Sequence, residues 1–243
     1  MLQPGKLRLD EALVARGLYQ TRARARDAVL RGTVFVDGEP ARKPSQNIYE
    51  EQALTLNDDA LKYVSRAALK LIHALDHFEI PVKGRECLDI GASSGGFCQV
   101  LLERGAAHVF AVEVGHSQMM LEDKRITLHE GLNARDLTLD HVSEHIELIT
   151  CDVSFIPLHI ALPPALELAN DRADLVALIK PQFEVGREHV GKGGIVKDEA
   201  LQKKSCDDVA SFLEQSGWHV QGIIASPIDG GDGNQEFLIA AKK

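Results

Sequence analysis

The sequence predicts an α/β fold in which a small α+β module precedes a seven-stranded, doubly wound, Rossmann-like sheet. From about residue 64 onward, short apolar stretches typical of buried strands alternate with stretches of helical periodicity. The first of those strands ends in DIGASSGGF (89–97), where small residues let a ligand lie against bare backbone. Residues 1–43 carry nine basic and five acidic side chains, a net +4, so the rest of the chain carries −13. A basic N-terminal segment on an otherwise acidic chain indicates that this segment belongs to a module that binds phosphate groups.

Length and composition limit the class of protein. At 243 residues the chain suits one large domain and one small one, and its 44% hydrophobic content can fill a proper core. No stretch approaches the roughly 18 apolar residues of a membrane span, and the N-terminus lacks the apolar centre of a signal peptide. The four cysteines form no C-x-x-C pair, which favours reduced thiols. We therefore expect a cytoplasmic protein with no membrane partner.

The N-terminal module, predicted to span residues 1–60, begins with two helices. Apolar spacing predicts the first over 7–17, and the second runs over 21–31 with Thr21 as its N-cap. A strand at 33–36 then enters a hairpin turn at Asp37-Gly38, and further short extended segments lie within 47–56. Residues 57–61 form a brief linker.

The second domain is predicted to span residues 64–243. Its first helix runs from Ser65, as the cap, to about residue 78. Strands are predicted at 86–90, 108–114, 126–129, 146–151, 173–179, 218–225 and 236–241, and helices at 96–104, 158–169 and 199–216. Only a loop joins the last two strands, which indicates an antiparallel edge. This arrangement is the usual sheet of methyltransferases.

The glycine-rich loop after the first of these strands is the candidate cofactor site. Its glycines, at 91, 95 and 96, do not match the G-x-G-x-x-G spacing that cradles a pyrophosphate, and no phosphate loop of the G-x-x-x-x-G-K-[ST] type is present. The loop therefore suits a nucleoside without phosphates, such as S-adenosylmethionine. Glu113 ends the next strand, about twenty residues later, where an acidic side chain meets a ribose in such folds. Tight strand–helix packing and an ordinary charged strand end are the alternatives.

Two further polar residues end predicted strands and would face the same crevice. Asp152 follows the fourth strand in CDVSF, and Lys180 closes an apolar run in LIKPQF, where an unpaired lysine is unusual. The Asp-Val-Ser-Phe turn lacks the prolines common in methyltransferases that act on amines. A desolvated lysine beside another cation has a lowered pKa and suits deprotonation of a hydroxyl. Lys70 and Glu236, taken singly, would be judged ordinary surface charges.

The N-terminal module resembles the S-four-type RNA-binding domain. The matching residues are Arg8-Leu9-Asp10, Thr21-Arg22, Ala25-Arg26, Gly32, Val34, Val36 and Asp37-Gly38. The resemblance implies an RNA-binding surface built from Arg8, Arg22, Arg24, Arg26, Arg31 and Lys43. The alternative is that the arginines form a solvated helix face.

The full chain resembles the TlyA (hemolysin A) family of rRNA 2′-O-methyltransferases, whose catalytic domain is of the FtsJ/RrmJ class. The resemblance rests on SRAALKL, CLDIGASSGGF, GAAHVFAVEVG, NAR, DVSFI, KPQFEVG, GGIVKD and SPIDGGDGNQEF. It implies a catalytic tetrad of Lys70, Asp152, Lys180 and Glu236, with Lys180 as the base. It also implies S-adenosylmethionine as cofactor, held by Asp89, Gly91, Ser93, Gly95, Gly96, Phe97, Glu113 and Asn133, with no metal.

The family's substrates imply the partner, which is ribosomal RNA or a ribosomal subunit. The methyl acceptor would be a cytidine ribose. The chain begins its first helix almost at once and stops after its final strand, like the shorter members, which modify only the large-subunit (23S) site. The glycine-rich stretch 185–196 is expected to be a mobile flap over the substrate.

Three other functions were weighed. The family name suggests a haemolysin, but the sequence shows no membrane-inserting segment. HVSEH at 141–145 fits the H-x-x-E-H metal pattern literally, yet it lacks a third ligand and is predicted to be a short exposed helix. A non-catalytic RNA-binding factor for ribosome assembly is the third, and the intact tetrad disfavours it.

Overall fold

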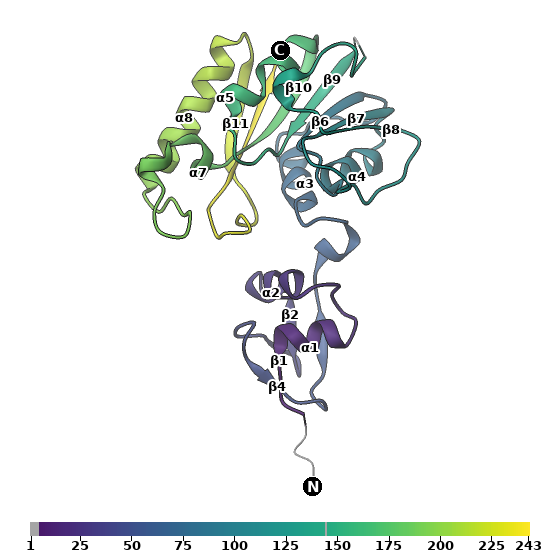
Figure 1. Cartoon of the computed structure of the whole chain (residues 1–243), viewed down its shortest axis with the longest axis vertical. Helices are drawn as coiled ribbons and strands as arrows, with labels where there is room; N and C mark the ends of the chain where they lie inside the picture. The colour runs from purple at the N-terminus through teal and green to yellow at the C-terminus, as the bar shows by residue number, and fades with distance from the viewer. Residues whose placement is uncertain (1–4, 144) are drawn as a thin grey trace. The chain divides into compact units, whose positions relative to one another are not determined.

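The chain forms two compact units, which meet after Leu61. The computed structural model describes residues 5–143 and 145–243. Unit 1 comprises residues 1–61 and unit 2 comprises residues 62–243 (Figure 1). Each unit has a hydrophobic core of its own, so the two are described separately.

Unit 1 is a small α+β domain. Its elements are β1 (Leu7–Arg8), α1 (Leu9–Ala15), α2 (Arg22–Leu30), β2 (Val34–Val36), β3 (Glu39–Pro40), β4 (Asn47–Ile48) and β5 (Leu54–Leu56), followed by the 3-10 helix η1 (Asp59–Lys62). The Thr21 side chain accepts a hydrogen bond from the backbone N–H of Arg24, so the predicted cap of α2 is confirmed. Asp37 and Gly38 both have positive φ, which is the geometry of the predicted hairpin turn between β2 and β3.

The first helix of unit 1 is shorter than predicted. Leu7 and Arg8 pair with β4 as an antiparallel strand, so α1 begins only at Leu9. Its apolar face then packs on α2 and on the strands. The core formed in this way contains Leu9, Leu13, Tyr19, Ala25, Ala28, Val29, Val34 and Ile48.

Unit 2 is a seven-stranded sheet with helices on both faces (Figure 1). Its strands are β6 (Glu86–Ile90), β7 (His108–Glu113), β8 (Ile126–Glu130), β9 (Ile146–Cys151), β10 (Ala169–Ile179), β11 (His219–Ala225) and β12 (Phe237–Lys242). Its helices are α3 (Ala68–His77), α4 (Gly96–Glu103), α5 (Leu158–Ala161), α6 (Pro163–Leu168), α7 (Pro181–Glu184) and α8 (Glu199–Gln215), with 3-10 turns η2 (Ala134–Asp136) and η3 (Arg187–His189). The strand order is β11-β12-β10-β9-β6-β7-β8. The predicted seven-stranded doubly wound fold is therefore confirmed.

The predicted antiparallel edge is confirmed, because the edge strand β11 pairs antiparallel with β12. β12 pairs antiparallel with both β10 and β11, so it lies one place in and β11 forms the edge. The carboxyl ends of β6, β7, β9 and β10 consequently share one side of the sheet with the start of β12. Residues that follow the parallel strands can there meet residues that precede β12.

Two predicted helices differ from the structure. The stretch predicted as one helix over 158–169 breaks at Leu162, because Pro163 lacks the N–H that would continue α5 and instead opens α6. Residue 169 already belongs to β10. The helix predicted from Ser65 begins at Ala68, and Ser65 caps nothing in it, although its hydroxyl accepts a hydrogen bond from the Ala67 N–H at 3.2 Å.

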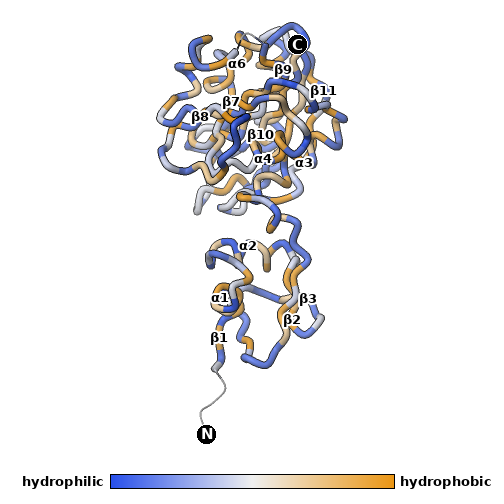
Figure 2. The backbone as a smooth tube through the Cα atoms, turned by 90° about the vertical axis from the view of Figure 1, so that its right-hand side faces the viewer, coloured by the Kyte–Doolittle hydropathy of each residue, from blue (hydrophilic) through white to orange (hydrophobic). Residues whose placement is uncertain are grey.

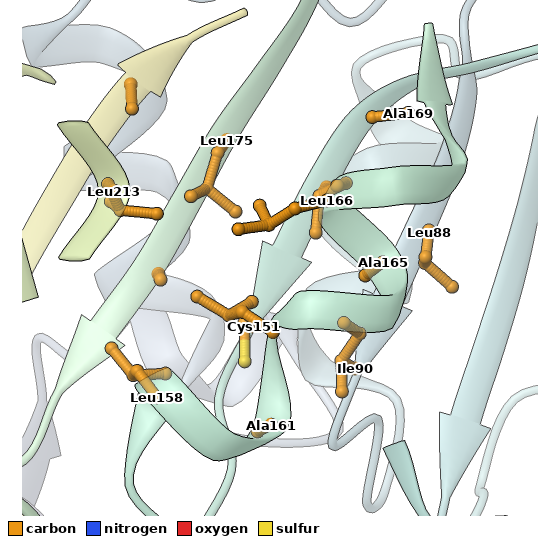
Figure 3. Packing of buried hydrophobic residues seen from close by; sticks show 14 of the residues in the cluster. Leu88, Ile90, Cys151, Leu158, Ala161, Ala165, Leu166, Ala169, Leu175 and Leu213 are labelled. Carbon is orange, nitrogen blue, oxygen red and sulfur yellow. The ribbon is translucent and has the colours of Figure 1, made fainter. Parts of the chain in front are cut away.

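Apolar residues fill both faces of the sheet. On one face α5, α6 and α8 cover residues such as Ile90, Cys151 and Leu175 (Figure 3). On the other face α3 and α4 cover residues such as Leu148 and Leu238. Figure 2 shows hydrophobic residues concentrated along central strands such as β7 and β10. Strands buried on both faces read as continuous apolar runs, which is why their positions follow from the sequence.

Candidate active site

A cavity of about 650 Å³ opens where β6, β7 and β9 end, and this volume is typical of a small-molecule site. Its walls come mainly from the loops that follow these strands. Its lining residues are Ile90, Gly91, Ser93, Val112, Glu113, Val114, Gln118, Leu132, Asn133, Ala134, Arg135, Asp152, Val153, Ser154, Phe155, Ile156, Pro157 and Ile160. Arg135 is the one basic side chain among these described residues. A mainly apolar pocket with so little positive charge fits a nucleoside better than a phosphate ester.

Gly91 lies where the loop after β6 crosses the end of β9. It has φ of +82°, and a Cβ at this position would lie 2.6 Å from the backbone carbonyl oxygen of Asp152. The Asp152 N–H in turn donates to the Ile90 carbonyl at 2.9 Å. Only glycine fits this crossing, so Gly91 has a packing role as well as lining the cavity.

Glu113 organises the rim of the cavity. One carboxylate oxygen accepts a hydrogen bond from the Ser93 N–H at 2.8 Å, and the other accepts from the Gly115 N–H at the same distance. The side chain is buried at the end of β7 and still lines the cavity. Glu113 thus joins the loop after β6 to the loop after β7, and its remaining lone pairs can accept from a bound ligand.

Four of the residues predicted to hold the cofactor do not line this cavity, namely Asp89, Gly95, Gly96 and Phe97. Met119 and Leu121 cover Gly95, and Ser65 packs directly on Gly96. The Phe97 side chain belongs to the core under α3 and α4. The first half of the glycine-rich loop, with Gly91 and Ser93, lines the cavity, whereas the close approach at its second half serves packing within the protein.

The Asp89 carboxyl faces the interior and not the ligand cavity. It is fully buried, and it accepts hydrogen bonds from the Thr150 hydroxyl at 2.8 Å and the Cys98 thiol at 3.1 Å. Burial raises the pKa of Asp89 to about 6, although these two hydrogen bonds work in the opposite direction. Asp89 therefore ties β6 to β9 and α4 beneath the loop.

Several lining residues were missed at the level of sequence. Gln118 lies on the cavity wall, and its side-chain oxygen accepts from the Ser93 hydroxyl at 3.2 Å. Ile156 and Ile160 supply an apolar wall from the start of α5. Gln118 follows β7 in a loop without regular structure, so no spacing rule could assign it. Ile156 precedes α5 and Ile160 lies within it, so no single periodicity in the sequence joins the two.

A second cavity, of about 410 Å³, adjoins the first. Its lining residues are Lys70, Ser154, Phe155, Lys180, Gln182, Phe183, Val190, Gly194, Gly231, Asp232 and Glu236. Ser154 and Phe155 line both cavities, so the two meet at the turn after β9. Phe155 has φ of +68°, is 90% exposed and lies 5.1 Å from Phe183, measured between ring centroids.

The structure brings the four predicted tetrad residues to this place as two ion pairs. The Lys180 ammonium lies 2.6 Å from Asp152 Oδ1, and it donates a hydrogen bond to the Ser154 hydroxyl at 2.9 Å. Lys70 and Glu236 form the second pair, and both are buried. The interpretation of Lys70 and Glu236, taken singly, as surface charges is therefore wrong. Helical periodicity placed Lys70 off the apolar stripe of α3, but β10 and β12 also contact this helix.

A hollow of about 420 Å³ in unit 1 gathers some of the predicted RNA-binding arginines. Arg8, Arg22 and Arg26 line it. Asp10, itself buried, accepts hydrogen bonds from both Arg8 and Arg22 at 2.9–3.2 Å. The guanidinium of Arg8 is the main cause that lowers the pKa of Asp10 to about 2. Arg22 and Arg26 stand four residues apart on α2 and share one face.

The other predicted RNA-binding residues lie elsewhere in unit 1. Arg24 does not line the hollow, because the alternation of arginine and alanine has a period of two and α2 has a period of 3.6. Lys43 is exposed beside the hollow. Arg31 was predicted to bind RNA, but its guanidinium is occupied by Asp27 at 2.8 Å and by both oxygens of Asp58 at 2.7 and 2.9 Å. These ion pairs give Arg31 a structural role in unit 1, and its contact with RNA stays a prediction.

The alternative metal pattern does not form the expected element. The HVSEH stretch includes residue 144, which lies outside the described residues, and its described part is a turn and not a helix. His141 bonds to Thr138 through Nδ1 at 3.0 Å. Within residues 5–143 and 145–243, no group of three His, Cys, Asp or Glu side chains is placed to hold a metal. All four cysteines are buried free thiols.

None of the helices in the described part of the chain combines the length and the apolar character that a bilayer span requires.

Comparison with known proteins gives two family matches. The model of FtsJ-like methyltransferases matches residues 63–243, and the model of the S4 domain matches residues 7–52. The chain is 44% identical over 238 residues to the 16S/23S rRNA (cytidine-2′-O)-methyltransferase TlyA of Mycobacterium tuberculosis, which covers 96% of this chain and 89% of that protein. It is 37% identical over 227 residues to the 23S rRNA (cytidine-2′-O)-methyltransferase TlyA of Campylobacter jejuni, covering 87% and 88%.

A solved structure agrees with these matches over the whole chain. A protein of Streptococcus thermophilus that carries the name hemolysin matches with a TM-score of 0.76 and 39% identity, covering 99% of this chain and 89% of that one. The family model spans residues 63–243 of unit 2, and the match to the Mycobacterium tuberculosis protein covers 96% of the chain. The chain is therefore an FtsJ-like methyltransferase with an N-terminal S4 domain, and it belongs to the TlyA (hemolysin A) family.

Proposed function

We propose that this protein transfers a methyl group from S-adenosylmethionine to the 2′-hydroxyl of a cytidine ribose in ribosomal RNA, most specifically in 23S rRNA. The observation that carries the proposal is the meeting of two cavities at Ser154 and Phe155. One cavity suits a nucleoside cofactor and the other is lined by paired lysines and carboxylates. A methyl group transferred from the first cavity to the second therefore has to cross only the edge that the two cavities share.

The first cavity fits S-adenosylmethionine by its chemistry. Glu113 is placed to accept hydrogen bonds from ribose hydroxyls, and Asn133 offers an amide near the apolar wall. Ile156 and Ile160 would cover an adenine ring. When bound, the cofactor supplies a methyl group on a sulfonium, which needs an aligned nucleophile. Gly91 and Ser93 would then lie beside the methionine part.

The second cavity would hold the acceptor ribose. Lys180 is the residue we assign as base, because it lies on the shared edge through its hydrogen bond to Ser154. Asp152 holds the Lys180 side chain in place, and Lys180 would take the hydroxyl proton in its neutral amine form; Lys70 and Glu236 line the same cavity and would orient the hydroxyl. Positioning of this kind supplies much of the rate in a displacement at a methyl group.

Unit 1 would bind the RNA. Arg8, Arg22 and Arg26 present guanidinium groups around one hollow, which is the chemistry that recognises phosphate. The assignment of cytidine and 23S rRNA follows the relatives, since 23S is the RNA that both methyltransferase names share.

Methylation of rRNA with labelled S-adenosylmethionine tests the proposal. Purified ribosomal RNA and subunits from a strain that lacks the gene are the substrates, and alkaline hydrolysis follows. We expect an alkali-resistant dinucleotide containing 2′-O-methylcytidine from 23S rRNA, because the modified hydroxyl can no longer attack the phosphate. A methylated base would refute the ribose assignment, and product from 16S rRNA would extend the substrate. Binding to either RNA without any turnover would favour an assembly factor.

Melting curves test the cofactor independently. S-adenosylmethionine at a hundredfold excess over its dissociation constant should stabilise the protein by about 3 kcal/mol, whereas NAD and ATP should not. Equal shifts with all three ligands would contradict the assignment of the first cavity.

A further inference from the structure

The side chain of Asn234 makes a buried set of hydrogen bonds close to the acceptor cavity. It is 1% exposed. Its Oδ1 accepts from the Val196 N–H at 2.9 Å, and its Nδ2 donates to the Gly194 carbonyl at 2.8 Å. The same Nδ2 also donates to Asp232 at 2.8 Å. Every polar atom of this amide is therefore used.

Two of these contacts hold the glycine-rich stretch expected to be a mobile flap. The stretch folds back on itself, since the Gly191 N–H donates to the Ile195 carbonyl at 3.0 Å. Val196 is buried, and its carbonyl accepts from the Gln202 side chain at 2.8 Å. Gly194 lines the acceptor cavity. The stretch is thus docked, and one amide fixes it at the point where it forms a cavity wall.

The other contacts of Asn234 fix the loop that leads into β12. Its backbone carbonyl accepts from the Gly230 N–H at 2.8 Å. A Cβ at Gly230 would lie 2.7 Å from Glu236 Oε1 and 2.9 Å from Asp232 Oδ1. The carboxylates of Glu236 and Asp232 therefore both lie beside Gly230. Asn234 stands two residues before Glu236 in the chain. Its fixation therefore limits where the Glu236 carboxylate can lie.

We propose that Asn234 is a positioning residue for the acceptor cavity, holding the wall at Gly194 and the loop of Glu236 in one arrangement. The inference rests on the proposed function, since it concerns the site of the acceptor ribose. The amide supplies the donor for Gly194 and the acceptor for Val196 at once, which neither a carboxylate nor an alkyl side chain can do. Asn234→Asp keeps the acceptor and removes the donor, and Asn234→Ala removes both.

Steady-state methylation of rRNA by the full chain tests this role, with binding of S-adenosylmethionine measured by calorimetry. We expect both variants to lose roughly tenfold to a hundredfold in kcat, with the cofactor dissociation constant unchanged within about twofold. Hydrogen exchange at the Val196 amide should quicken in Asn234→Ala. Asn170→Ala is the matched control, since the Asn170 side chain accepts only a local bond from the Arg172 N–H at 2.9 Å, and it should behave as wild type.

Three outcomes would overturn the inference. Wild-type kcat in both variants would show that the amide positions nothing that matters to the reaction. Cofactor affinity that falls together with kcat, or failure of both variants to fold, would make Asn234 a residue of general stability. Wild-type protein that is inactive on rRNA would refute the proposed function alone, and exchange at Val196 would still decide whether Asn234 holds the segment.

Discussion

Lys70 and Glu236 form a buried ion pair although 166 residues separate them in the chain. Lys70 lies on α3, the first helix of unit 2, and Glu236 directly precedes its last strand. Removing one partner leaves the other as a buried charge without its counterion, which is costly. The pair therefore acts as a unit.

We expect Lys70→Ala and Glu236→Ala each to reduce turnover severely, and the double variant to lose little more than either single one. Turnover of all three variants with saturating S-adenosylmethionine measures this. Melting temperatures provide the control for folding. Additive losses would mean that the two side chains act separately.

Lys180→Ala should lower kcat by about a hundredfold to ten-thousandfold, the usual contribution of a general base. Its fold should persist, because Lys180 lies at the end of β10 beside the cavity and not within the apolar core. Single-turnover methylation gives the rate, and calorimetry should show unchanged affinity for the cofactor. Lys203→Ala, on the exposed face of α8, is the matched control. A fully active Lys180→Ala would remove the proposed base.

Glu113→Ala should weaken S-adenosylmethionine binding by roughly tenfold to a hundredfold, because it loses charged hydrogen bonds at the rim of the cavity. Saturating cofactor should restore most of the turnover. Titration calorimetry measures the dissociation constant, and Glu130→Ala, at the exposed end of β8, should leave it unchanged. Unaltered binding in Glu113→Ala would place the ribose elsewhere.

Reversal of Arg22 and Arg26 to Glu should abolish measurable binding of rRNA and leave cofactor binding intact. The double alanine variant should already show the loss of two phosphate contacts. In a plot of the logarithm of its RNA-binding constant against the logarithm of the salt concentration, the slope should be shallower by about two. Filter binding at several salt concentrations measures it. Reversal of Lys203 and Lys204 changes the net charge equally and should have no such effect. Normal methylation by the double reversal variant would make α2 a solvated face.

The Asp89 carboxyl should make stability depend on pH. Its pKa is raised to about 6 in the folded protein, so its stabilising contribution is complete below the ordinary value of 3.8 and is lost as the pH rises through 6. The free energy of unfolding of Asp89→Asn, relative to wild type, should therefore rise by about 2 kcal/mol between pH 4 and pH 7. Urea titrations at each pH measure it, with exposed Asp171→Asn as the control. A constant difference would show that Asp89 is not protonated on folding.

Much of the fold follows from local sequence. Short, largely apolar stretches such as 146–151 and 86–90 mark strands that are covered on both faces, and the bounds of both strands were predicted correctly. The prediction of one helix over 158–169 was wrong for a different reason. The two prolines that follow the break at Leu162 are visible in the sequence, but the prediction placed them inside the helix. The insertion of β12 between β10 and β11 could not be predicted in this way, because it depends on contacts between strands that are distant in the sequence.

Some residues of the candidate site could likewise be predicted from local sequence, and others could not. Asp152 and Lys180 could be predicted because each ends a strand, and strand ends share one side of a parallel sheet. Lys70 and Glu236 needed the family resemblance, since their burial arises only when α3 meets β12. The ion pair between Arg31 and Asp58 could not be predicted. A basic residue on an arginine-rich helix carries no local sign of a partner, and Asp58 stands 27 residues away.

The position of β12 in the sheet determines when, during folding, the acceptor cavity can form. Within residues 5–143 and 145–243, β11 is hydrogen-bonded in the sheet to β12 alone, and Glu236 directly precedes β12. Until β12 has been inserted between β10 and β11, the acceptor cavity lacks the wall that Glu236 supplies. Completion of the sheet and completion of the acceptor cavity are therefore one folding event, and a molecule in which β12 is unpaired would have no acceptor cavity.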